Sequence, residues 1–274
     1  MRKLPEEPGW QETPSPFDHS AALYDAEFEN SPATRRLRRI TTGAFLQLFP
    51  AGSHLLELNC GTGTDAVKLA RHGMKIMATD ASAAMLEEAR KKIAAECLSD
   101  SITLELLPFR EIARLKGQKF DGVYSNMGGL NCVPDVRSVA LELAGLVSTG
   151  AYVAACMLSD VSLWETTAFL LRGNLGNAFR RKTPSGVVAR IHKSSIPVYY
   201  HSPASVADQF APHFRKVSVI GLNIFSPPPS SQRAYKILGK GRIALERLDD
   251  LVSGLFPFNN LGDHFLIVLE RTDV

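Results

Sequence analysis

The sequence predicts an α/β protein built on a doubly wound, mainly parallel sheet. Short apolar runs alternate with segments whose apolar residues recur at helical spacing, and this alternation repeats through residues 54–157. A glycine-containing turn, Gly61-Thr62-Gly63, joins the first apolar run to the first helical segment. Strands that alternate with helices in this way are typical of parallel sheets with crossover helices. At 274 residues, the chain can hold one large domain or a domain with an insertion.

Two helices are expected before the first strand. Apolar residues recur at helical spacing over residues 17–28. Ser31-Pro32 then provides a capping residue followed by proline at the first helical position, and the helix that it opens should end before Pro50. Residues 1–16 are rich in proline and glutamate, so we expect a loose N-terminal arm and a single domain over residues 17–274.

The remaining elements follow from the same patterns. The expected strands are residues 54–58, 75–79, 102–106, 120–126, 150–157, 216–220 and 264–270. One helix is expected directly after Gly63, and a second is expected to begin at Ser82. Three more are expected over residues 135–147, 202–210 and 234–254. Residues 159–200 depart from a minimal fold, with an apolar helical stretch, a basic cluster and a two-stranded piece, and are predicted to be an insertion after the fifth strand.

The turn at Gly61 predicts a nucleotide-type cofactor site. Glycines lack a Cβ, so the backbone can turn tightly and approach a ligand, while the following helix presents free N–H groups. Glu57 lies within the first strand, where a carboxylate suits a cationic group such as the amino group of an amino acid. Asp80 ends the second strand, nineteen residues after Gly61, where a carboxylate suits a ribose diol.

The run Glu57-Leu58-Asn59-Cys60-Gly61-Thr62-Gly63, together with Asp80-Ala81-Ser82 and Met85-Leu86, resembles the class I S-adenosylmethionine-dependent methyltransferases. The resemblance covers roughly residues 17–158 and implies S-adenosyl-L-methionine as cofactor. It also implies a Rossmann-like fold in which the N-terminal helices cover the cofactor, the last strand is antiparallel and the insertion caps the substrate. The spacing of Gly61, Gly63 and Ala66 nearly satisfies the NAD fingerprint, so an NAD-dependent oxidoreductase is an alternative.

The resemblance also assigns residues to the cofactor. Asp80 would hold the ribose hydroxyls, or else cap a helix, and Glu57 would lie near the methionine amino group, or else form a buried salt bridge. Pro108 stands where family members often have an acidic residue that binds adenine, so recognition there would rely on backbone. The residues expected at the cofactor are Tyr24, Glu57, Asn59, Cys60, Gly61, Gly63, Asp80, Ala81, Met85, Phe109, Arg110, Asn126 and Met127.

Methyl transfer is an in-line displacement that depends mainly on positioning in a dry pocket, and a base is needed only for some acceptors. The candidates at the correct edge of the sheet are Tyr24, His201, His264 and Asn131, each with a packing, capping or turn-stabilising alternative. Asp263 and His264 are sequential, so they are expected to point to opposite sides of a strand and not to form a dyad.

Aromatic residues of the insertion and the C-terminal loops would line an acceptor pocket for a lipophilic or aromatic small molecule, or else would pack the insertion onto the core. They are Trp164, Phe169, Phe179, Tyr199, Tyr200, Phe225 and Phe258.

The composition limits the classes of binding partner that we expect. A net charge of +3 is too small to indicate a nucleic-acid partner, although the basic clusters at residues 35–39 and 180–182 leave an RNA methyltransferase as an alternative. We interpret the run at residues 35–39 as a solvated face of a helix. Met127-Gly128-Gly129 follows Asn126, which argues against DNA base methylation.

The four cysteines form no Cys-x-x-Cys pair, and no run approaches 18 apolar residues. We therefore expect a reduced cytoplasmic protein without a metal or a membrane span. A non-catalytic partner protein with this fold is a further alternative. The acceptor, the methylated atom and the oligomeric state stay open.

Overall fold

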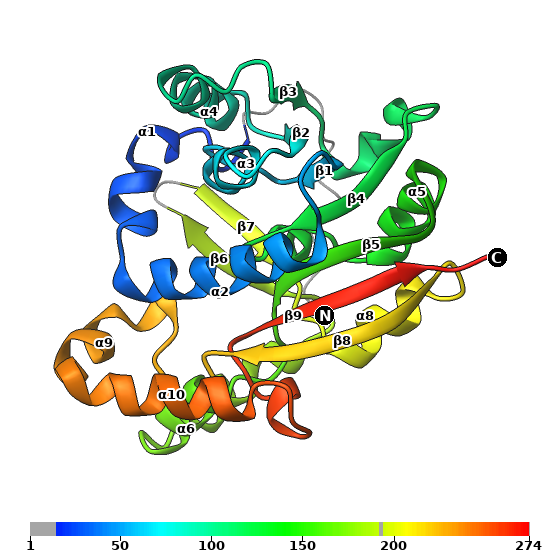
Figure 1. Ribbon diagram of the computed structural model, residues 1–274. Helices are drawn as coiled ribbons and strands as arrows, with labels where there is room; N and C mark the ends of the chain where they lie inside the picture. Colours follow the sequence, from blue (N-terminus) through cyan, green and yellow to red (C-terminus); the bar gives the residue numbers. More distant parts are fainter. Residues whose placement is uncertain (1–14, 192–193, 274) are drawn as a thin grey trace.

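Seven strands form one sheet in the order β3-β2-β1-β4-β5-β9-β8, and β6 and β7 form a separate hairpin (Figure 1). The computed structural model describes residues 15–191 and 194–273, so most of the expected arm and His192 lie outside the described residues. The strands are β1 His54–Leu58, β2 Lys75–Asp80, β3 Ile102–Leu106, β4 Phe120–Ser125, β5 Val147–Leu158, β6 Val187–Ile191, β7 Ser194–Val198, β8 Phe214–Leu222 and β9 His264–Arg271.

The pairing confirms the predicted fold class. Strands β3, β2, β1, β4 and β5 are parallel, whereas β9 is antiparallel to both of its neighbours. The last strand therefore lies between β5 and β8, and β8 forms the edge of the sheet. The strand order reverses at β1, which lies between β2 and β4. In open sheets of this kind, ligands bind beyond the carboxyl ends of the strands at this reversal.

Most helices begin where the sequence predicts. The serine side chains of Ser31, Ser82 and Ser202 each accept a hydrogen bond from the backbone N–H three residues later. The α-helices are α1 Ala21–Tyr24, α2 Pro32–Leu48, α3 Thr64–Ala70, α4 Ala83–Ala95, α5 Val136–Leu146, α6 Leu163–Leu170, α7 Leu175–Ala178, α8 Pro203–Phe210, α9 Gln232–Leu238 and α10 Arg242–Val252. A π-helical turn, η1 Asp25–Glu29, continues α1. The 3₁₀ turns are η2 Phe109–Leu115, η3 Gly129–Cys132, η4 Arg180–Lys182, η5 Pro229–Ser231, η6 Gly239–Gly241 and η7 Phe258–Asn260.

One predicted helix is wrong. Residues 234–254 were expected to be continuous, but α9 ends at Leu238 and α10 begins at Arg242. Gly239 adopts a positive φ of 49°, outside the helical region, and this breaks the helix. The apolar periodicity continues on both sides of the break, which is why it predicted one helix.

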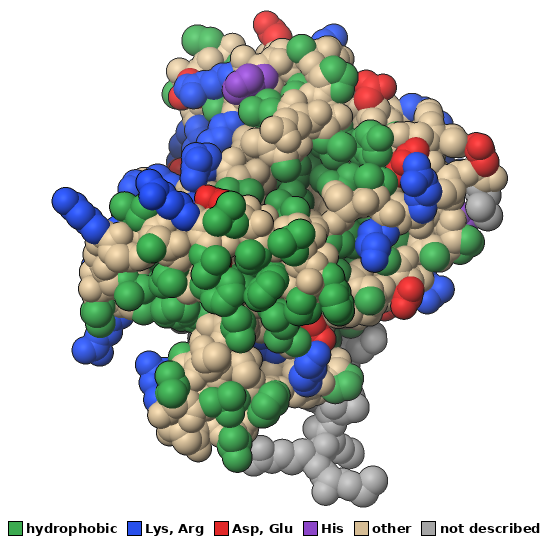
Figure 2. Space-filling model, turned by 60° about the horizontal axis from the view of Figure 1, so that its bottom comes forward, with side chains coloured by type: hydrophobic (Ala, Val, Ile, Leu, Met, Phe, Trp, Pro, Cys, Tyr) green, Lys and Arg blue, Asp and Glu red, His purple; other side chains and the backbone are tan. Residues whose placement is uncertain are grey.

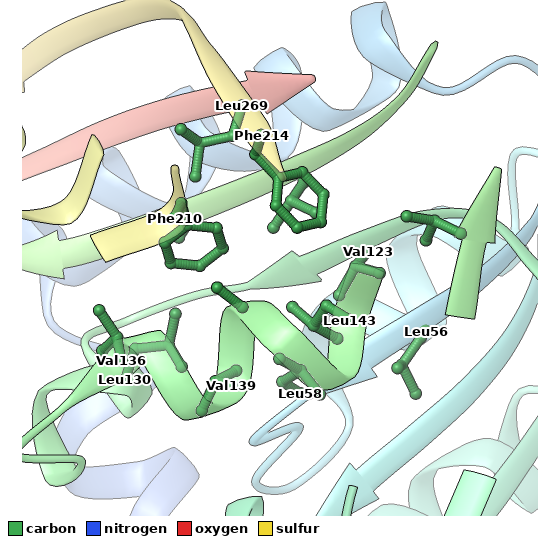
Figure 3. Packing of buried hydrophobic residues seen from close by; sticks show 14 of the residues in the cluster. Leu56, Leu58, Val123, Leu130, Val136, Val139, Leu143, Phe210, Phe214 and Leu269 are labelled. Atoms are coloured by element: carbon green, nitrogen blue, oxygen red, sulfur yellow. The ribbon is translucent and has the colours of Figure 1, made fainter. Parts of the chain in front are cut away.

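Apolar layers cover both faces of the sheet. On one face, Leu56 and Leu58 of β1 pack with residues of α5, α8 and the neighbouring strands (Figure 3). On the other face, Leu55 lies in a second cluster with residues of α2, α3 and α4. Successive side chains of a strand alternate between faces, so Glu57 lies on the same face as Leu55. A carboxyl group is therefore buried beneath helices in an apolar layer.

The insertion after β5 is confirmed as structure, with α6, α7, η4 and the β6–β7 hairpin. Over the parts of the chain that the structure describes, no helix combines the length and apolar character needed to cross a bilayer.

Candidate functional site

The turn between β1 and α3 has an open outer side. Gly61 and Gly63 have positive φ angles of 55° and 74°. A Cβ built on Gly63 would lie 3.1 Å from the Cβ of Ala89, so this glycine allows α3 and α4 to pack closely. A Cβ built on Gly61 would meet no atom within 4 Å. Nothing in the protein itself requires glycine at position 61 for space, which fits close approach of a ligand.

Asp80 holds this turn. Its Oδ2 accepts a hydrogen bond from the N–H of Gly61, and its Oδ1 accepts one from the N–H of Ser82, both at 2.8 Å. The hydroxyl of Ser82 caps α4, so Asp80 is not needed as the cap. Burial raises the pKa of Asp80, and the backbone N–H groups of Gly61, Ser82 and Ala81 oppose the rise. A carboxylate accepts about four hydrogen bonds, so it retains capacity for ribose hydroxyls.

Glu57 is buried without an ionic partner in the described residues. Its side chain is 2% exposed, and Oε2 accepts no hydrogen bond from any group that the structure describes. Burial raises the pKa of Glu57 well above its usual range; the nearby charge of Asp65 adds to the rise, and the Tyr124 hydroxyl opposes it. The salt-bridge alternative therefore has no support here. An ammonium group would satisfy the free oxygen.

Asn59 joins the ends of β1 and β4. It has a positive φ of 53°, its Oδ1 accepts from the Ser125 hydroxyl at 2.6 Å, and its Nδ2 donates to the Asn126 carbonyl at 2.9 Å. A Cβ on Gly129 would lie 2.0 Å from the Asn59 side chain. Gly129 is thus required by Asn59, a reason that the sequence alone did not reveal.

A buried ionic network fixes α2 above this turn. Arg38 of α2 pairs with Asp65 in the first turn of α3 and with Glu29. The amide of Asn126 donates to Asp65 at 2.8 Å. The sequence predicts a solvated face for the basic run at residues 35–39, but Arg36 and Arg38 are each only 7% exposed. The interpretation is wrong at these two positions because they face acidic groups on neighbouring elements.

The N-terminal segment closes over the turn, as the resemblance implies. The Thr62 hydroxyl donates to Asp25 at 2.6 Å, and Lys92 of α4 lies 2.7 Å from the same carboxylate. The Ser82 hydroxyl donates to Asp18. Tyr24 belongs to this segment, and burial raises the pKa of its hydroxyl. Asp18, Asp25 and Lys92 were not anticipated, because only the fold brings them to the glycine turn.

The other residues expected at the cofactor differ in exposure. Ala81 and Arg110 are exposed, Met85 and Cys60 are buried, and Met127 is half-buried. Phe109 is half-buried and packs against the apolar cluster beneath α5. The Asn126 side chain is committed to Thr41 and Asp65.

Three of the catalytic candidates meet at the end of β5. Asn131 accepts from the Leu158 N–H at 2.8 Å and donates to the carbonyls of Leu158 and Tyr199 at 3.0 and 2.7 Å. His264 lies opposite Leu158 in the sheet, and His201 forms a bridge with the next residue. Tyr24 lies apart, at the end of α1, where the charges of Arg38 and Asp80 act on its hydroxyl. The bonds of Asn131 favour a structural role for its side chain.

The expectation that Asp263 and His264 point apart is wrong. Asp263 Oδ2 lies 3.0 Å from His264 Nδ1. Asp263 occupies a bend before β9, so strand alternation does not apply to it. Burial raises the pKa of Asp263, but Arg181, 2.6 Å away, and His264 outweigh burial and hold it below its usual range. The carboxylate therefore stays ionised beside the imidazole.

His201 is buried, and its Nε2 has no partner among the described groups. Burial lowers the pKa of His201, and the Val133 backbone opposes this. A neutral ring with a free nitrogen can accept a proton.

The aromatic residues expected around an acceptor partly serve packing. The guanidinium of Arg181 lies 4.8 Å from the ring centre of Tyr200, and that of Arg180 lies 5.9 Å from Phe169. Phe225 and Phe258 contact each other, with ring centres 5.8 Å apart, whereas Phe179 is 57% exposed. Trp164 and Tyr199 are half-buried.

Two surface hollows, of about 200 and 440 Å³, lie elsewhere, against α2 and at the amino ends of the strands. Among the residues that the structure describes, no cluster of His, Cys, Asp and Glu could hold a metal ion.

Comparison with known proteins identifies a methyltransferase domain around this turn. Residues 55–150 match the family model described as a methyltransferase domain. The demethylmenaquinone methyltransferase of Symbiobacterium thermophilum is 34% identical over 135 residues, which cover 42% of this chain and 51% of that protein. The S-adenosyl-L-methionine-dependent Diels-Alderase iccD of Talaromyces variabilis is 32% identical over 96 residues, 34% of this chain and 33% of the relative. The matched part of the chain thus spans between a third and about half of the length of these relatives.

A solved structure shows the same fold over nearly the whole chain. The 4+2 cyclase SpnF superposes with a TM-score of 0.60 at 13% identity, covering 93% of each chain. The family match decides between the S-adenosylmethionine and NAD interpretations of the Gly61 turn. Residues 55–150 of this chain form a methyltransferase domain of the class I S-adenosylmethionine-dependent type.

Proposed function

We propose that this protein transfers a methyl group from S-adenosyl-L-methionine to a small lipophilic or aromatic acceptor. The observation that carries the proposal is the open space over Gly61, bordered by the carboxylate of Asp80. The demethylmenaquinone methyltransferase among the relatives supports a small-molecule acceptor.

The residues present fit the cofactor. Asp80 has acceptor capacity for the ribose hydroxyls, and the unpartnered Oε2 of Glu57 suits the methionine ammonium. Gly61 has no side chain, and a Cβ built on it would meet no atom within 4 Å. When bound, the cofactor supplies an electrophilic methyl group on a sulfonium. The N-terminal segment, bonded to Thr62 through Asp25, would keep water out of the site.

His201 would take the proton from a hydroxyl or ammonium acceptor. Its ring is neutral because burial lowers its pKa, and Nε2 is unpartnered among the described residues. His264 is the less suited of the two, because its Nδ1 already lies 3.0 Å from the carboxylate of Asp263. The insertion, residues 159–200, would cap the acceptor.

Calorimetric titration with S-adenosylmethionine and with its demethylated product tests the cofactor assignment. Asp80→Ala should weaken binding by about 1–3 kcal/mol, because ribose hydroxyls lose their acceptor. The matched control is Asp121→Ala, since Asp121 also accepts from a strand-end backbone N–H, that of His54 at 2.7 Å, but at the opposite edge. Equal affinity in the Asp80 variant and the wild type would refute the ribose assignment. Parallel titrations with NAD and with RNA should give no binding.

A second candidate function is a cycloaddition that uses the bound sulfonium without consuming it. The Diels-Alderase relative favours it, since a Diels–Alder reaction joins two π-systems and transfers no methyl group. Incubation with a panel of acceptors separates the two functions: methyl transfer releases S-adenosylhomocysteine in step with product, whereas cycloaddition does not.

A further inference from the structure

Helix α10 turns two acidic side chains inward and leaves apolar side chains exposed at its surface. Asp249 is 2% exposed and accepts a hydrogen bond from the Phe225 N–H at 2.7 Å. Glu246, also on the inner side, accepts from the Tyr235 hydroxyl at 2.6 Å. The outer side carries Ile243 and Leu251, with exposed fractions of 42% and 76%. A surface helix of a water-exposed protein normally shows the reverse arrangement.

The apolar exposure continues on both sides of this helix. We name these residues the α9–α10 patch: Ile237, Ile243, Leu248, Leu251, Leu255 and Phe256. Ile237 is 75% exposed on α9, and Phe256, which follows α10, is 82% exposed. Figure 1 places α9 and α10 together at one end of the molecule, and Figure 2, with that end turned forward, shows hydrophobic side chains gathered across the face. Several exposed apolar side chains on neighbouring elements indicate an interaction surface.

Basic side chains border the patch. Arg233, Lys236, Lys240 and Arg247 are exposed, and none has an ion-pair partner within residues 15–191 and 194–273. The acidic residues of the same segment are occupied on the inner side or, like Asp250, paired with Arg36 of α2. The outer surface is therefore apolar with a positive margin, and Figure 2 shows Lys and Arg at the edge of the face.

We propose that the α9–α10 patch docks on an anionic lipid bilayer. Apolar side chains flanked by lysine and arginine match the acyl and headgroup layers of such a surface, with the chain lying on the membrane and not crossing it. A second copy of this chain fits less well, because a two-fold contact through the patch would bring two positive margins together. The proposal is independent of the methyl-transfer assignment.

Sedimentation with vesicles tests the proposal on the full chain. Wild-type protein should bind vesicles of equal parts phosphatidylglycerol and phosphatidylcholine more tightly than vesicles of phosphatidylcholine alone. Binding should weaken as salt is raised. Replacing Lys236 and Lys240 by alanine should weaken binding to the anionic vesicles about fivefold for each residue. Leu251→Asp should weaken it about tenfold or more, since the apolar contact is lost.

Two matched controls lie on α5. Leu141 is 53% exposed and Arg137 is exposed, so Leu141→Asp and Arg137→Ala change the same chemistry away from the patch and should bind like the wild type. Circular dichroism verifies that each variant is folded. Failure of the wild type to bind either vesicle overturns the proposal, as does equal loss in the α5 controls. Gel filtration supplies another contrary result: a dimer that Leu251→Asp dissociates, without vesicle binding, would assign the patch to a second copy.

Discussion

The variant Gly61→Ala should lower the stability of the protein slightly and its affinity for the cofactor more strongly. Gly61 has a left-handed φ of 55°, and an alanine in this conformation destabilises the folded state by about 1–2 kcal/mol. Alanine also lowers the conformational entropy of the unfolded chain, which stabilises the protein by about 0.4–1 kcal/mol. The protein has no atom within 4 Å of the new Cβ, so no clash adds to this cost. We expect a net loss near 1 kcal/mol, seen in scanning calorimetry as a fall of about 2–4 °C in Tm.

Cofactor affinity should fall further than stability. The new methyl group occupies the space where the cofactor would lie against the backbone, and overfilling a packed contact costs about 1–3 kcal/mol, or about 5–150-fold in Kd. Gly52→Ala is the matched control. Gly52 also has a positive φ, of 89°, and open space around its Cβ, but it lies in the turn before β1, at the opposite edge. Calorimetric titration with S-adenosylmethionine should show full affinity for the Gly52 variant. Unchanged affinity in Gly61→Ala, or an equal loss in both variants, would refute the reasoning.

Three further variants test the surrounding network in urea unfolding. Gly129→Ala should lose about 1–3 kcal/mol, because its Cβ would lie 2.0 Å from Asn59, and adding Asn59→Gly should restore part of it. Arg38→Leu should lose about 3–5 kcal/mol by leaving Asp65 buried without its cation, and a loss below about 1 kcal/mol would contradict a buried pair. Folding raises the pKa of Glu57, so the free energy of unfolding of the wild type should fall as pH rises from the unfolded pKa, about 4.3, toward the higher folded pKa. Glutamine does not titrate, so Glu57→Gln should become more stable relative to the wild type over this pH range. Parallel pH curves for the two proteins would exclude a neutral buried carboxyl.

Elements defined by local patterns could be predicted from the sequence. Alternating apolar runs identified the strands of the sheet, and a serine before an apolar helical run marked the starts of α2, α4 and α8, because a cap needs only residues close in sequence. The turn at Gly61 and the carboxylate at Asp80 were found for the same reason. Residue types and spacings carried that information.

Long-range contacts could not be predicted. Arg38 pairs with Asp65 across 27 residues, and Arg181 with Asp263 across 82, so no local periodicity relates them. The same holds for Asp25 over Thr62. The position of Asp263 relative to His264 depended on a strand boundary, and one residue decides whether side-chain alternation applies. In α10 the amphipathic pattern was visible, but only the packing shows which side faces inward.

The amide of Asn131 binds the chain where the insertion departs, at Leu158, and where it returns, at Tyr199. The two ends of the insertion are therefore hydrogen-bonded to the same side chain, at the end of the sheet where β5 ends. A segment anchored in this way can be exchanged for one of another length or composition while the strands beneath keep their register. On the proposal that residues 159–200 cap the acceptor, exchanging this segment would change the acceptor and leave the turn at Gly61 and Asp80 as it is.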